Sequence, residues 1–409
     1  MNAAAPVAIL RSGHHGGLAI ARSLGRMGVP VYSVDGARWE PALSSRYCRG
    51  RFRLDIERNP AEESVRKLIE IGRQLGSPIL IPATDRGAIW VAEHAGPLQQ
   101  GFRLSCPRAA LVRQLCDKGT MQQLARQCGV PTAISAVPRS LRDVEQFLAT
   151  AVFPVMVKAT DAVRLRQRVG GTKFLVHTRS ELLELYSRAE DREEPNLLLQ
   201  EFIPGEDWMF DGYFDANSRC LFGVTGKKIR RFPVNTGVTS LGICLHNDAV
   251  EKTTLDFMRA IGYRGILDIG YRRDSRTGQY KVLDVNPRIG CTFRLFAATN
   301  GMDVARALYL DMTGQPVPSA RAAEGRKWLV EDFDLLSALR SWREGALGLK
   351  EWAKSLRGVQ EVACFSLDDP LPFFLMGAAD CSEFYRWLRV RLGIRRAAFS
   401  KSPKADWTA

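Results

Sequence analysis

One short stretch of this chain restricts its fold more than any other. The sequence from 281 to 290 is KVLDVNPRIG, so an apolar strand carries Asp284 and Asn286 two positions apart. Side chains alternate between the faces of a strand, so both polar groups are expected on one face, in the same row as Val282. Arg288 follows two positions later. A carboxylate and an amide buried without partners would cost free energy, so other polar groups should lie beside them.

The preceding strand, GILDIGY, supplies one such group. Between the two strands, the sequence YRRDSRTGQYK predicts a short hairpin loop near Thr277, because its glycine can adopt a left-handed conformation. A pair between Ser275 and Gln279 would set the register of the hairpin. That register places Asp268 opposite Asn286, and cross-strand partners share a face.

Asp268, Asp284 and Asn286 are therefore expected within a few ångströms of one another. Two carboxylates and an amide oxygen, without histidine or cysteine, suit Mg²⁺, which keeps several waters and takes its remaining ligands from phosphate. A pair of acids that face solvent near a sheet edge is the alternative.

The N-terminal segment predicts a Rossmann-like unit. Residues 7–36 have the pattern of strand, Gly-rich turn, helix and strand, with Gly13, Gly16 and Gly17 in the turn. Asp35 ends the second strand, where a dinucleotide fold places an acidic ribose ligand. The glycine spacing is G-x-x-G-G, which differs from the G-x-G-x-x-G fingerprint. The turn is expected to face a substrate, and NAD binding is the alternative.

Helices and strands alternate through the middle of the chain. A helix with an Asp cap should begin after residue 117 and stop at Gly129. The apolar strand FPVMVK ends in Lys158, and a polar basic loop that contains Gly170 and Gly171 is expected to follow it. Further elements are expected at 61–75 (helix), 78–85 (strand), 196–215 (two strands with a hinge at Pro204-Gly205), within 219–237 (a strand with a basic end) and 249–261 (helix).

The charge and the cysteines restrict the class of protein. The formal net charge is +14, concentrated partly at 164–168, 227–231 and 389–396. An anion-binding active site, nucleic-acid binding and solvated basic surfaces are three explanations, but no zinc finger or RNA-recognition strand accompanies these clusters. The nine cysteines show no metal-ligand spacing, which favours free thiols in a reducing cytoplasm. No apolar run reaches about 18 residues, and the N-terminus lacks the basic head of a signal peptide.

Several of these motifs together resemble the ATP-grasp superfamily. Over about residues 1–315, the matching features are, in order, Lys118, Lys158, Gly170-Gly171, QEFIPGED, Asp268 and DVNPR. The hairpin segment is most similar to the carboxylate–amine ligase branch, which includes D-aspartate ligases and the synthetase domains of carbamoyl phosphate synthase. Asp284 stands where that branch usually has Glu, and a basic segment stands in place of its Gly-rich lid.

The resemblance implies an α/β chain with an α+β ATP-grasp core. A Rossmann-like domain, a small lid subdomain, a large subdomain with the Mg-ATP site and a mostly helical extension would occupy 1–115, 116–195, 196–318 and 319–409. Hinges near Thr132 and Pro195 would let the lid close over ATP and exclude water. Helices are expected at 331–358 and, rich in basic residues, at 383–396. Docking on the core is the first expectation for this extension, with contact to an anionic membrane surface or assembly into a homo-oligomer as alternatives.

The resemblance also implies a role for each matched residue. Arg288 would act in catalysis by stabilising the transferring phosphoryl group, together with Lys158. Lys227 and Arg231, which alternation places on one face, would bind the substrate, as would Asp85 at the end of a strand. The expected contacts with ATP are Lys118, Lys158, Gly170, Gly171, Glu201, Ile203, Glu206 and Asp207. The expected ligands of two Mg²⁺ ions, with Mn²⁺ as an alternative metal, are Asp268, Asp284 and Asn286.

The implied reaction has two steps. A substrate carboxylate attacks the γ-phosphate of ATP to give an acyl phosphate and ADP, and an amine then displaces phosphate to form an amide. The expected substrates are a small anionic acid, with a second carboxylate, and an amine. Carboxylation, acid–thiol ligation, an NAD-dependent Rossmann oxidoreductase and a non-catalytic nucleotide- or nucleic-acid-binding module are the alternatives, although no biotin or coenzyme A feature supports the first two.

Overall fold

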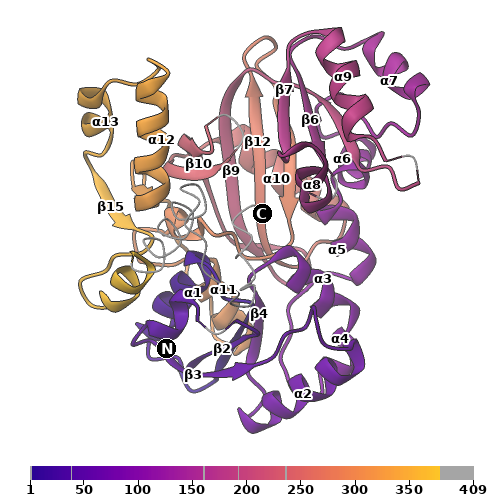
Figure 1. The fold of residues 1–409 in the computed structure, drawn as a ribbon. Coiled ribbons are helices and arrows are strands. Elements are labelled where there is room, and N and C mark those ends of the chain that lie inside the picture. The colour runs from indigo at the N-terminus through magenta and orange to yellow at the C-terminus, as the bar shows by residue number, and fades with distance from the viewer. Residues whose placement is uncertain (1, 38, 160–161, 192, 235–236, 378–409) are drawn as a thin grey trace, which may run out of the picture.

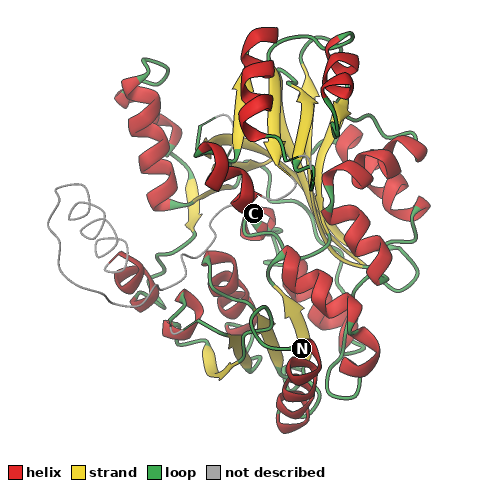
Figure 2. Cartoon of the chain, turned by 45° about the vertical axis from the view of Figure 1, so that its right-hand side comes forward, coloured by secondary structure: helices red, strands yellow, loops and turns green. Residues whose placement is uncertain are grey.

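Three β-sheets organise the chain. The computed structural model describes residues 2–37, 39–159, 162–191, 193–234 and 237–377. In Figure 1 the N-terminal sheet lies at the bottom, the large sheet in the centre and the small sheet at the upper right. Helices cover these sheets, so the expected mixed α/β class is confirmed (Figure 2). Within the described ranges, no helix has the length and apolar character needed to cross a membrane.

The N-terminal part is a parallel sheet surrounded by helices. Its elements are β1 (Val7–Leu10), α1 (His15–Gly25), β2 (Val31–Asp35), η1 (Pro41–Ser44), β3 (Cys48–Arg53), α2 (Ala61–Gln74), β4 (Ile79–Pro82), α3 (Asp85–Glu93), α4 (Ala95–Leu98) and α5 (Ala109–Cys116). The strand order is β3-β2-β1-β4, and all neighbours run parallel. This agrees with the strand–helix alternation predicted for the first part of the chain.

A tight turn connects β1 to α1. Gly17 leaves no room for a side chain, because a Cβ there would lie 2.3 Å from the carbonyl oxygen of Ser12. His14 caps the helix by accepting a hydrogen bond of 3.0 Å from the Gly16 N–H. The glycines therefore let the helix begin close to the sheet, as the sequence predicts.

The small sheet is antiparallel. The elements of this region are α6 (Lys118–Gln127), β5 (Ser135–Ala136), α7 (Leu141–Leu148), β6 (Val155–Ala159), α8 (Ala162–Val169), β7 (Lys173–Val176), α9 (Arg179–Ala189) and β8 (Leu197–Glu201). The strand order is β5-β8-β6-β7, and Leu182 and Tyr186 of α9 pack in one apolar cluster with Val155 of β6. β8 lies beyond the expected lid boundary at 195 but pairs within this sheet, and the domain boundaries stay a prediction.

The large sheet contains seven strands. Its first part consists of β9 (Gly205–Phe214), β10 (Cys220–Phe232), β11 (Val238–Cys244), α10 (Asp248–Ala260), β12 (Gly265–Asp274), β13 (Tyr280–Asn286), η2 (Phe293–Phe296) and α11 (Val304–Met312). One face packs against Phe257 of α10. Met209 of β9 lies on the other side, in a cluster that also contains Ile20 of α1. The N-terminal domain and the large sheet therefore share one hydrophobic core.

The C-terminal extension adds strands as well as helices. It contains β14 (Lys327–Leu329), α12 (Glu331–Arg343), α13 (Leu349–Ser355) and β15 (Val359–Val362). The helices expected at 331–358 are confirmed, but the sequence did not predict β14 and β15, which complete the order β13-β12-β9-β10-β11-β14-β15. The basic helix expected at 383–396 lies outside the described residues.

Two buried ion pairs attach this extension to the rest of the chain. Arg230 of β10 donates two hydrogen bonds of 2.8 Å to Asp334 of α12. Arg22 of α1 donates through Nε to Asp369 over 2.9 Å, and both side chains are almost inaccessible to solvent. The extension thus contacts the N-terminal domain and the large sheet directly.

Candidate functional site

The hairpin of β12 and β13 brings the predicted polar residues together. Asp268 pairs with Asn286 across the two strands, as the sequence predicts. Asn286 Nδ2 lies 3.3 Å from Asp268 Oδ2 and 3.4 Å from Asp284 Oδ2. Two carboxylates and an amide therefore meet on one face of the large sheet.

A β-bulge changes the expected register nearer the turn. The pairing shifts by one residue between Asp284 and Val282. The predicted pair of Ser275 with Gln279 is wrong, because the Asp274 N–H donates to the carbonyl oxygen of Gln279 over 2.8 Å. The expected row of Val282 beside Asp284 is also wrong, since Val282 is fully buried in the apolar core on the other face. The bulge separates the apolar side chains of β13 from its polar ones.

A further carboxylate lies beside this cluster. Asp211 of β9 pairs with Asp268 of β12, so both side chains point to one face. Asp211 is fully buried, and neither carboxylate oxygen has a hydrogen-bond partner among the described residues. Burial and the neighbouring Asp268 raise the pKa of Asp211 well above its usual range. Sequence reasoning missed this residue, whose signal is a single acid inside the apolar run WMFDGYF.

Four lysines act on the carboxylate cluster. Burial would raise the pKa of Asp284, but the charges of four lysines hold it below its ordinary value, namely Lys228, Lys118, Lys158 and Lys173. Burial lowers the pKa of Lys158 to about 7, and repulsion from Lys118 and Lys173 adds to the shift. These lysines come from α6, β6, β7 and β10. The sequence predicted Lys118 and Lys158 and missed Lys173, which is the cross-strand partner of Lys158.

The donor set fits a hard divalent cation. A Cβ on Gly270 would lie 2.7 Å from Asp284 Oδ1, and one on Gly290 would lie 2.6 Å from Asp268 Oδ2, so glycines keep carbon atoms away from the carboxylates. Asp211 adds a buried carboxyl group whose oxygens have no hydrogen-bond partner among the described residues, and a nearby cation would favour its ionised form. The described residues contain no group of three His, Cys, Asp or Glu side chains that could hold a metal alone. Phosphate and water oxygens would therefore have to complete the coordination.

Arg288 connects this cluster to the N-terminal domain. Its Nε donates to Asp85 Oδ1 over 2.7 Å, and its NH1 lies 3.7 Å from Asp268 Oδ2. Burial would lower the pKa of Arg288, but Asp85 and other anionic neighbours raise it, so the guanidinium stays charged. Asp85 begins α3, behind the Thr84 cap. The structure thus brings together two predicted site residues whose contact the sequence did not predict.

The basic strand β10 differs from its predicted alternation. Lys227 pairs with Glu206 at 2.5 Å, whereas Arg231 pairs with Asp207 at 3.0 Å. Glu206 and Asp207 are consecutive on β9, so Lys227 and Arg231 lie on opposite faces, and their expected common face is wrong. Register shifts on either side of Arg230 cause the change. Lys228, which lowers the pKa values of Asp268 and Asp284, faces the carboxylates.

The residues expected around adenosine take part in ion pairs. Glu201 also accepts a hydrogen bond of 3.2 Å from the Ile134 N–H, and Ile203 is buried. Lysine and arginine partners and this backbone bond outweigh burial and lower the pKa of Glu201. The ion pairs are Glu201–Lys281, Glu201–Arg276, Glu206–Lys227, Asp207–Arg231 and Asp207–Arg272.

The basic loop expected after β6 is a helix. Residues 162–169 form α8, and the Gly170 N–H donates to the carbonyl oxygen of Arg166 over 2.9 Å, with Gly170 at a φ of 76°. This geometry ends a helix with glycine in the left-handed region. Gly171 lies against the ring of Phe174. Arg164 pairs with Asp191 at 2.7 Å, so part of the local basic charge is neutralised within the small subdomain.

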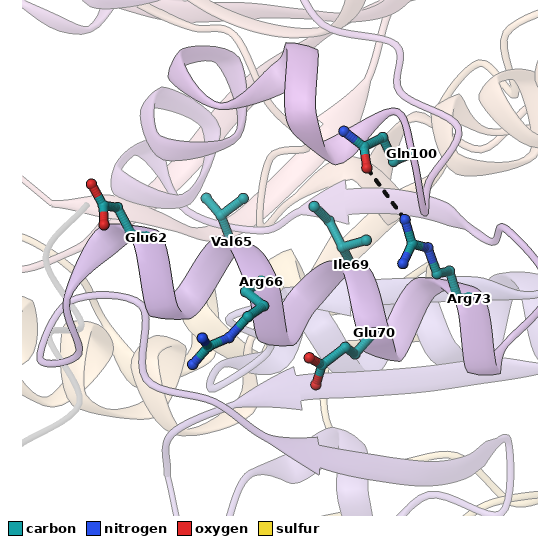
Figure 3. A pocket seen from close by; sticks show the side chains of 7 residues that line it. All are labelled: Glu62, Val65, Arg66, Ile69, Glu70, Arg73 and Gln100. Carbon is teal, nitrogen blue, oxygen red and sulfur yellow. Dashed lines mark hydrogen bonds between the residues drawn. The ribbon is translucent and has the colours of Figure 1, made fainter.

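A surface hollow lies elsewhere, along α2. Figure 3 shows that Arg73 reaches Gln100, with a hydrogen bond of 3.3 Å, at one end of this hollow. Its lining mixes acids, bases and aliphatic side chains and contains none of the predicted site residues: Glu62, Val65, Arg66, Ile69, Glu70, Arg73 and Gln100. The charges alternate along the helix and do not converge on a point. This hollow therefore carries no catalytic hypothesis.

No protein-family model matches the chain, but curated relatives match part of it. Over 240 residues the chain is 24% identical to the D-aspartate ligase of Enterococcus faecium. This alignment covers 56% of this chain and 57% of that protein. Over 249 residues it is 23% identical to the carbamoyl phosphate synthase large chain of Methanothermobacter thermautotrophicus. This alignment covers 58% of this chain and 22% of that protein. The chain thus matches less than two thirds of the length of both relatives.

The fold is also similar to a solved structure. The crystal structure of N5-carboxyaminoimidazole synthetase from Staphylococcus aureus, complexed with ADP, aligns with a TM-score of 0.62 at 15% identity. The alignment covers 79% of this chain and 81% of that one. Together with the two relatives, this similarity confirms the resemblance that the motifs predict.

Proposed function

We propose that this chain, which has the ATP-grasp fold, is an ATP-dependent ligase that joins a carboxylate to an amine through an acyl phosphate. The observation that carries the proposal is the cluster of Asp268, Asp284 and Asn286, surrounded by lysines from α6, β6, β7 and β10. Phosphoryl transfer depends mainly on positioning and on charge neutralisation, and this arrangement offers both. The similarity to D-aspartate ligase supports the same class of reaction.

The carboxylate cluster would hold the metal, and the lysines would hold the phosphates. Asp268, Asp284 and Asn286 are the candidate ligands of Mg²⁺, in two ions, with Mn²⁺ as an alternative metal. The bound metal would neutralise charge on the β- and γ-phosphates. Lys158 and Lys173 would bind phosphate oxygens as point charges, and Lys118, the first residue of α6, would assist them. Burial and repulsion from Lys118 lower the pKa values of both Lys158 and Lys173, and a bound anion would relieve the repulsion.

Arg288 would bind the developing acyl phosphate. Asp85 fixes its Nε, so the guanidinium is held in one orientation beside Asp268. A planar guanidinium donates two parallel hydrogen bonds to phosphate or carboxylate oxygens. Arg288 is buried, and a site that excludes water protects an acyl phosphate from hydrolysis.

The acid substrate would be anionic beyond its reacting carboxylate. Lys228 and Arg231 are the cations of β10 that face the site. Lys227, which the sequence favours, is less suitable, because its partner Glu206 lies on the other face. Arg231 already pairs with Asp207, so a substrate carboxylate would compete with that contact. Lys228 is therefore the better candidate for the second carboxylate.

A carboxylation reaction is the second candidate. The observation that favours it is the similarity in fold to N5-carboxyaminoimidazole synthetase. Both candidates activate an acid with ATP, so they differ in the identity of the acid. A test of the proposed function must therefore include bicarbonate among the acids.

A pairwise screen of acids and amines for release of ADP and phosphate tests this proposal. Monocarboxylic acids, dicarboxylic acids and bicarbonate would each be combined with amino acids and simple amines in the presence of Mg²⁺. We expect release that depends on both partners, and no release by Asp284→Asn with an unchanged circular dichroism spectrum. Turnover with bicarbonate alone among the acids would favour carboxylation. Full activity of Asp284→Asn would contradict the metal assignment.

A further inference from the structure

Helix α12 is unlike an ordinary surface helix, because its buried face is mostly polar. Its buried residues are Asp334, Ser337, Ala338 and Ser341. Asp334 accepts hydrogen bonds from Arg230, and the Ser337 hydroxyl donates to the carbonyl oxygen of Arg231 over 2.8 Å. A helix on the surface of a globular protein normally turns its apolar side to the core and its polar side to water. In α12 polar contacts hold the helix on β10, so its apolar side chains are left to face outward.

Three leucines and a tryptophan form the outer face of α12. The second, third and fourth of them follow the first by one, four and seven positions, which places all four on one side of the helix. Leu349, the first residue of α13, is also exposed. We call these five residues the apolar face, and they are between 40% and 55% exposed: Leu335, Leu336, Leu339, Trp342 and Leu349.

Exposed apolar side chains are concentrated in the C-terminal extension. Of the fifteen large hydrophobic side chains that are exposed among the described residues, nine lie between 331 and 377. Besides the apolar face they comprise Leu367, Leu371, Phe374 and Leu375. In Figure 1, α12, α13 and β15 lie together along one side of the molecule, away from the small sheet. Single exposed leucines are normal on a protein surface, but a concentrated group of them marks an interaction surface.

The charged residues beside the apolar face are mainly cations. Between positions 340 and 357 the chain has five lysines and arginines but two acids, Glu344 and Glu351. Glu344 already pairs with Arg340, and Glu351 accepts a hydrogen bond from the Gly348 N–H. The other four cations are exposed and form no ion pair with an acid among the described residues: Arg343, Lys350, Lys354 and Arg357. The apolar face therefore lies next to an excess of positive charge.

We propose that the apolar face docks on the surface of an anionic lipid membrane. Its leucines and Trp342 would enter the boundary between head groups and acyl chains, while the neighbouring lysines and arginines attract the anionic head groups. Residues 378–409 lie outside the described ranges, and their sequence adds seven lysines and arginines against three acids. A second copy of the chain is a less suitable occupant, because a twofold interface would bring the same cations together. The basic segment 378–409 of the same chain would meet the same repulsion.

Co-sedimentation of the full chain with lipid vesicles tests the proposal. The chain should bind vesicles of phosphatidylcholine mixed with phosphatidylserine, bind phosphatidylcholine alone far less, and dissociate at high salt. Leu336→Gln combined with Leu339→Gln should weaken binding to the anionic vesicles at least about tenfold, because two apolar side chains no longer enter the interface. Glutamine has nearly the helix propensity of leucine, so the circular dichroism spectrum should not change. Leu141→Gln with Val152→Gln is the matched control, since both residues are at least as exposed but lie in the small subdomain, and its binding should equal that of wild type.

A charge variant and a measurement of oligomeric state separate the membrane from other occupants. Lys350→Gln with Lys354→Gln should weaken binding to the anionic vesicles severalfold and leave the weak binding to phosphatidylcholine unchanged. Analytical ultracentrifugation without lipid should give the same oligomeric state for wild type and for the leucine variant. A wild-type dimer that the leucine variant dissociates would overturn the proposal in favour of a second copy of the chain. No binding of wild type to anionic vesicles, or equal binding of wild type and the leucine variant, would also overturn it.

Discussion

Replacement of Lys158 by methionine should make the protein more stable and, at the same time, unable to bind nucleotide well. Burial, together with repulsion from Lys118 and Lys173, lowers the pKa of Lys158 from 10.5 to about 7. Keeping Lys158 charged in the folded protein therefore lowers the free energy of unfolding. Methionine has a similar length and no charge, so Lys158→Met removes that cost and leaves the packing nearly intact.

The pKa shift sets the size of the effect. At roughly 1.4 kcal/mol per unit, the shift corresponds to about 5 kcal/mol. Lys158 Nζ donates a hydrogen bond to Gln200 Oε1, and a buried acceptor left without its donor costs about 1–3 kcal/mol. We expect Lys158→Met to raise the free energy of unfolding by about 2–4 kcal/mol at pH 7.

The stability difference should depend on pH with a defined sign. Between pH 7 and 10.5 the unfolded chain binds more protons at Lys158 than the folded chain does, so wild-type stability rises with pH in this window. Methionine does not titrate, and the advantage of the variant should therefore shrink as the pH approaches 10.

Urea unfolding of both proteins at pH 7 and pH 9.5, with calorimetric titration of Mg-ADP, measures both effects. The expected result is a more stable variant at pH 7, a smaller difference at pH 9.5 and markedly weaker ADP binding. A variant that is less stable than wild type at pH 7, or a difference that does not change with pH, would refute the idea of a costly buried cation. Unchanged ADP binding would refute its role at the phosphates.

Three further experiments test other parts of the structure. Asn286→Ala should abolish Mg²⁺-dependent ADP release without changing the circular dichroism spectrum, because it removes the amide side chain, a candidate metal ligand, from the carboxylate cluster. Asp334→Ala should lower the free energy of unfolding by about 3–5 kcal/mol, since it leaves Arg230 buried without its partner. Arg230→Met in the same chain should restore only part of this loss in urea unfolding, because Trp352 and Ser240 also donate hydrogen bonds to Asp334. Burial raises the pKa of Glu40 to about 7, so between about pH 4.5 and 7 the folded protein keeps the Glu40 carboxyl protonated while the unfolded chain releases the proton. Wild-type stability therefore falls as the pH rises through this window. Melting temperatures of Glu40→Gln should lack this component of the pH dependence.

Local sequence patterns predicted the centre of the site well. The hairpin is short, so its turn chemistry and the polar spacing of Asp284 and Asn286 were enough to place Asp268 opposite Asn286. The prediction was correct there although Ser275 does not pair with Gln279. The bulge next to Asp284 restores the expected register beyond it. Such a bulge depends on the packing of Val282, which lies in the core with residues of other elements, and the hairpin sequence alone does not reveal it.

Features that depend on distant contacts could not be predicted in this way. β14 and β15 are too short for a periodic pattern and form strands because they pair with β11 and with each other. Lys173 reaches the site through its partner strand, and Asp211 through the order of strands in the large sheet. The segment 162–169 contains residues compatible with a helix, but the Gly170-Gly171 pair that follows is also typical of a loop, so the local sequence does not distinguish the two.

The buried pair of Arg22 and Asp369 has a consequence for biosynthesis. The two residues are separated by 347 positions in the chain, and Asp369 also accepts a hydrogen bond from Ser45 over 2.6 Å. During translation, α1 therefore has to wait until residue 369 has been synthesised before the buried guanidinium of Arg22 finds its counter-ion. Domains generally fold from the N-terminus as they are synthesised, but this first domain can reach its final packing only when the last described segment has left the ribosome. Until then Arg22 is an unpaired charge, and burying it would cost desolvation free energy. The nascent chain should therefore stay hydrated and loosely packed around Arg22.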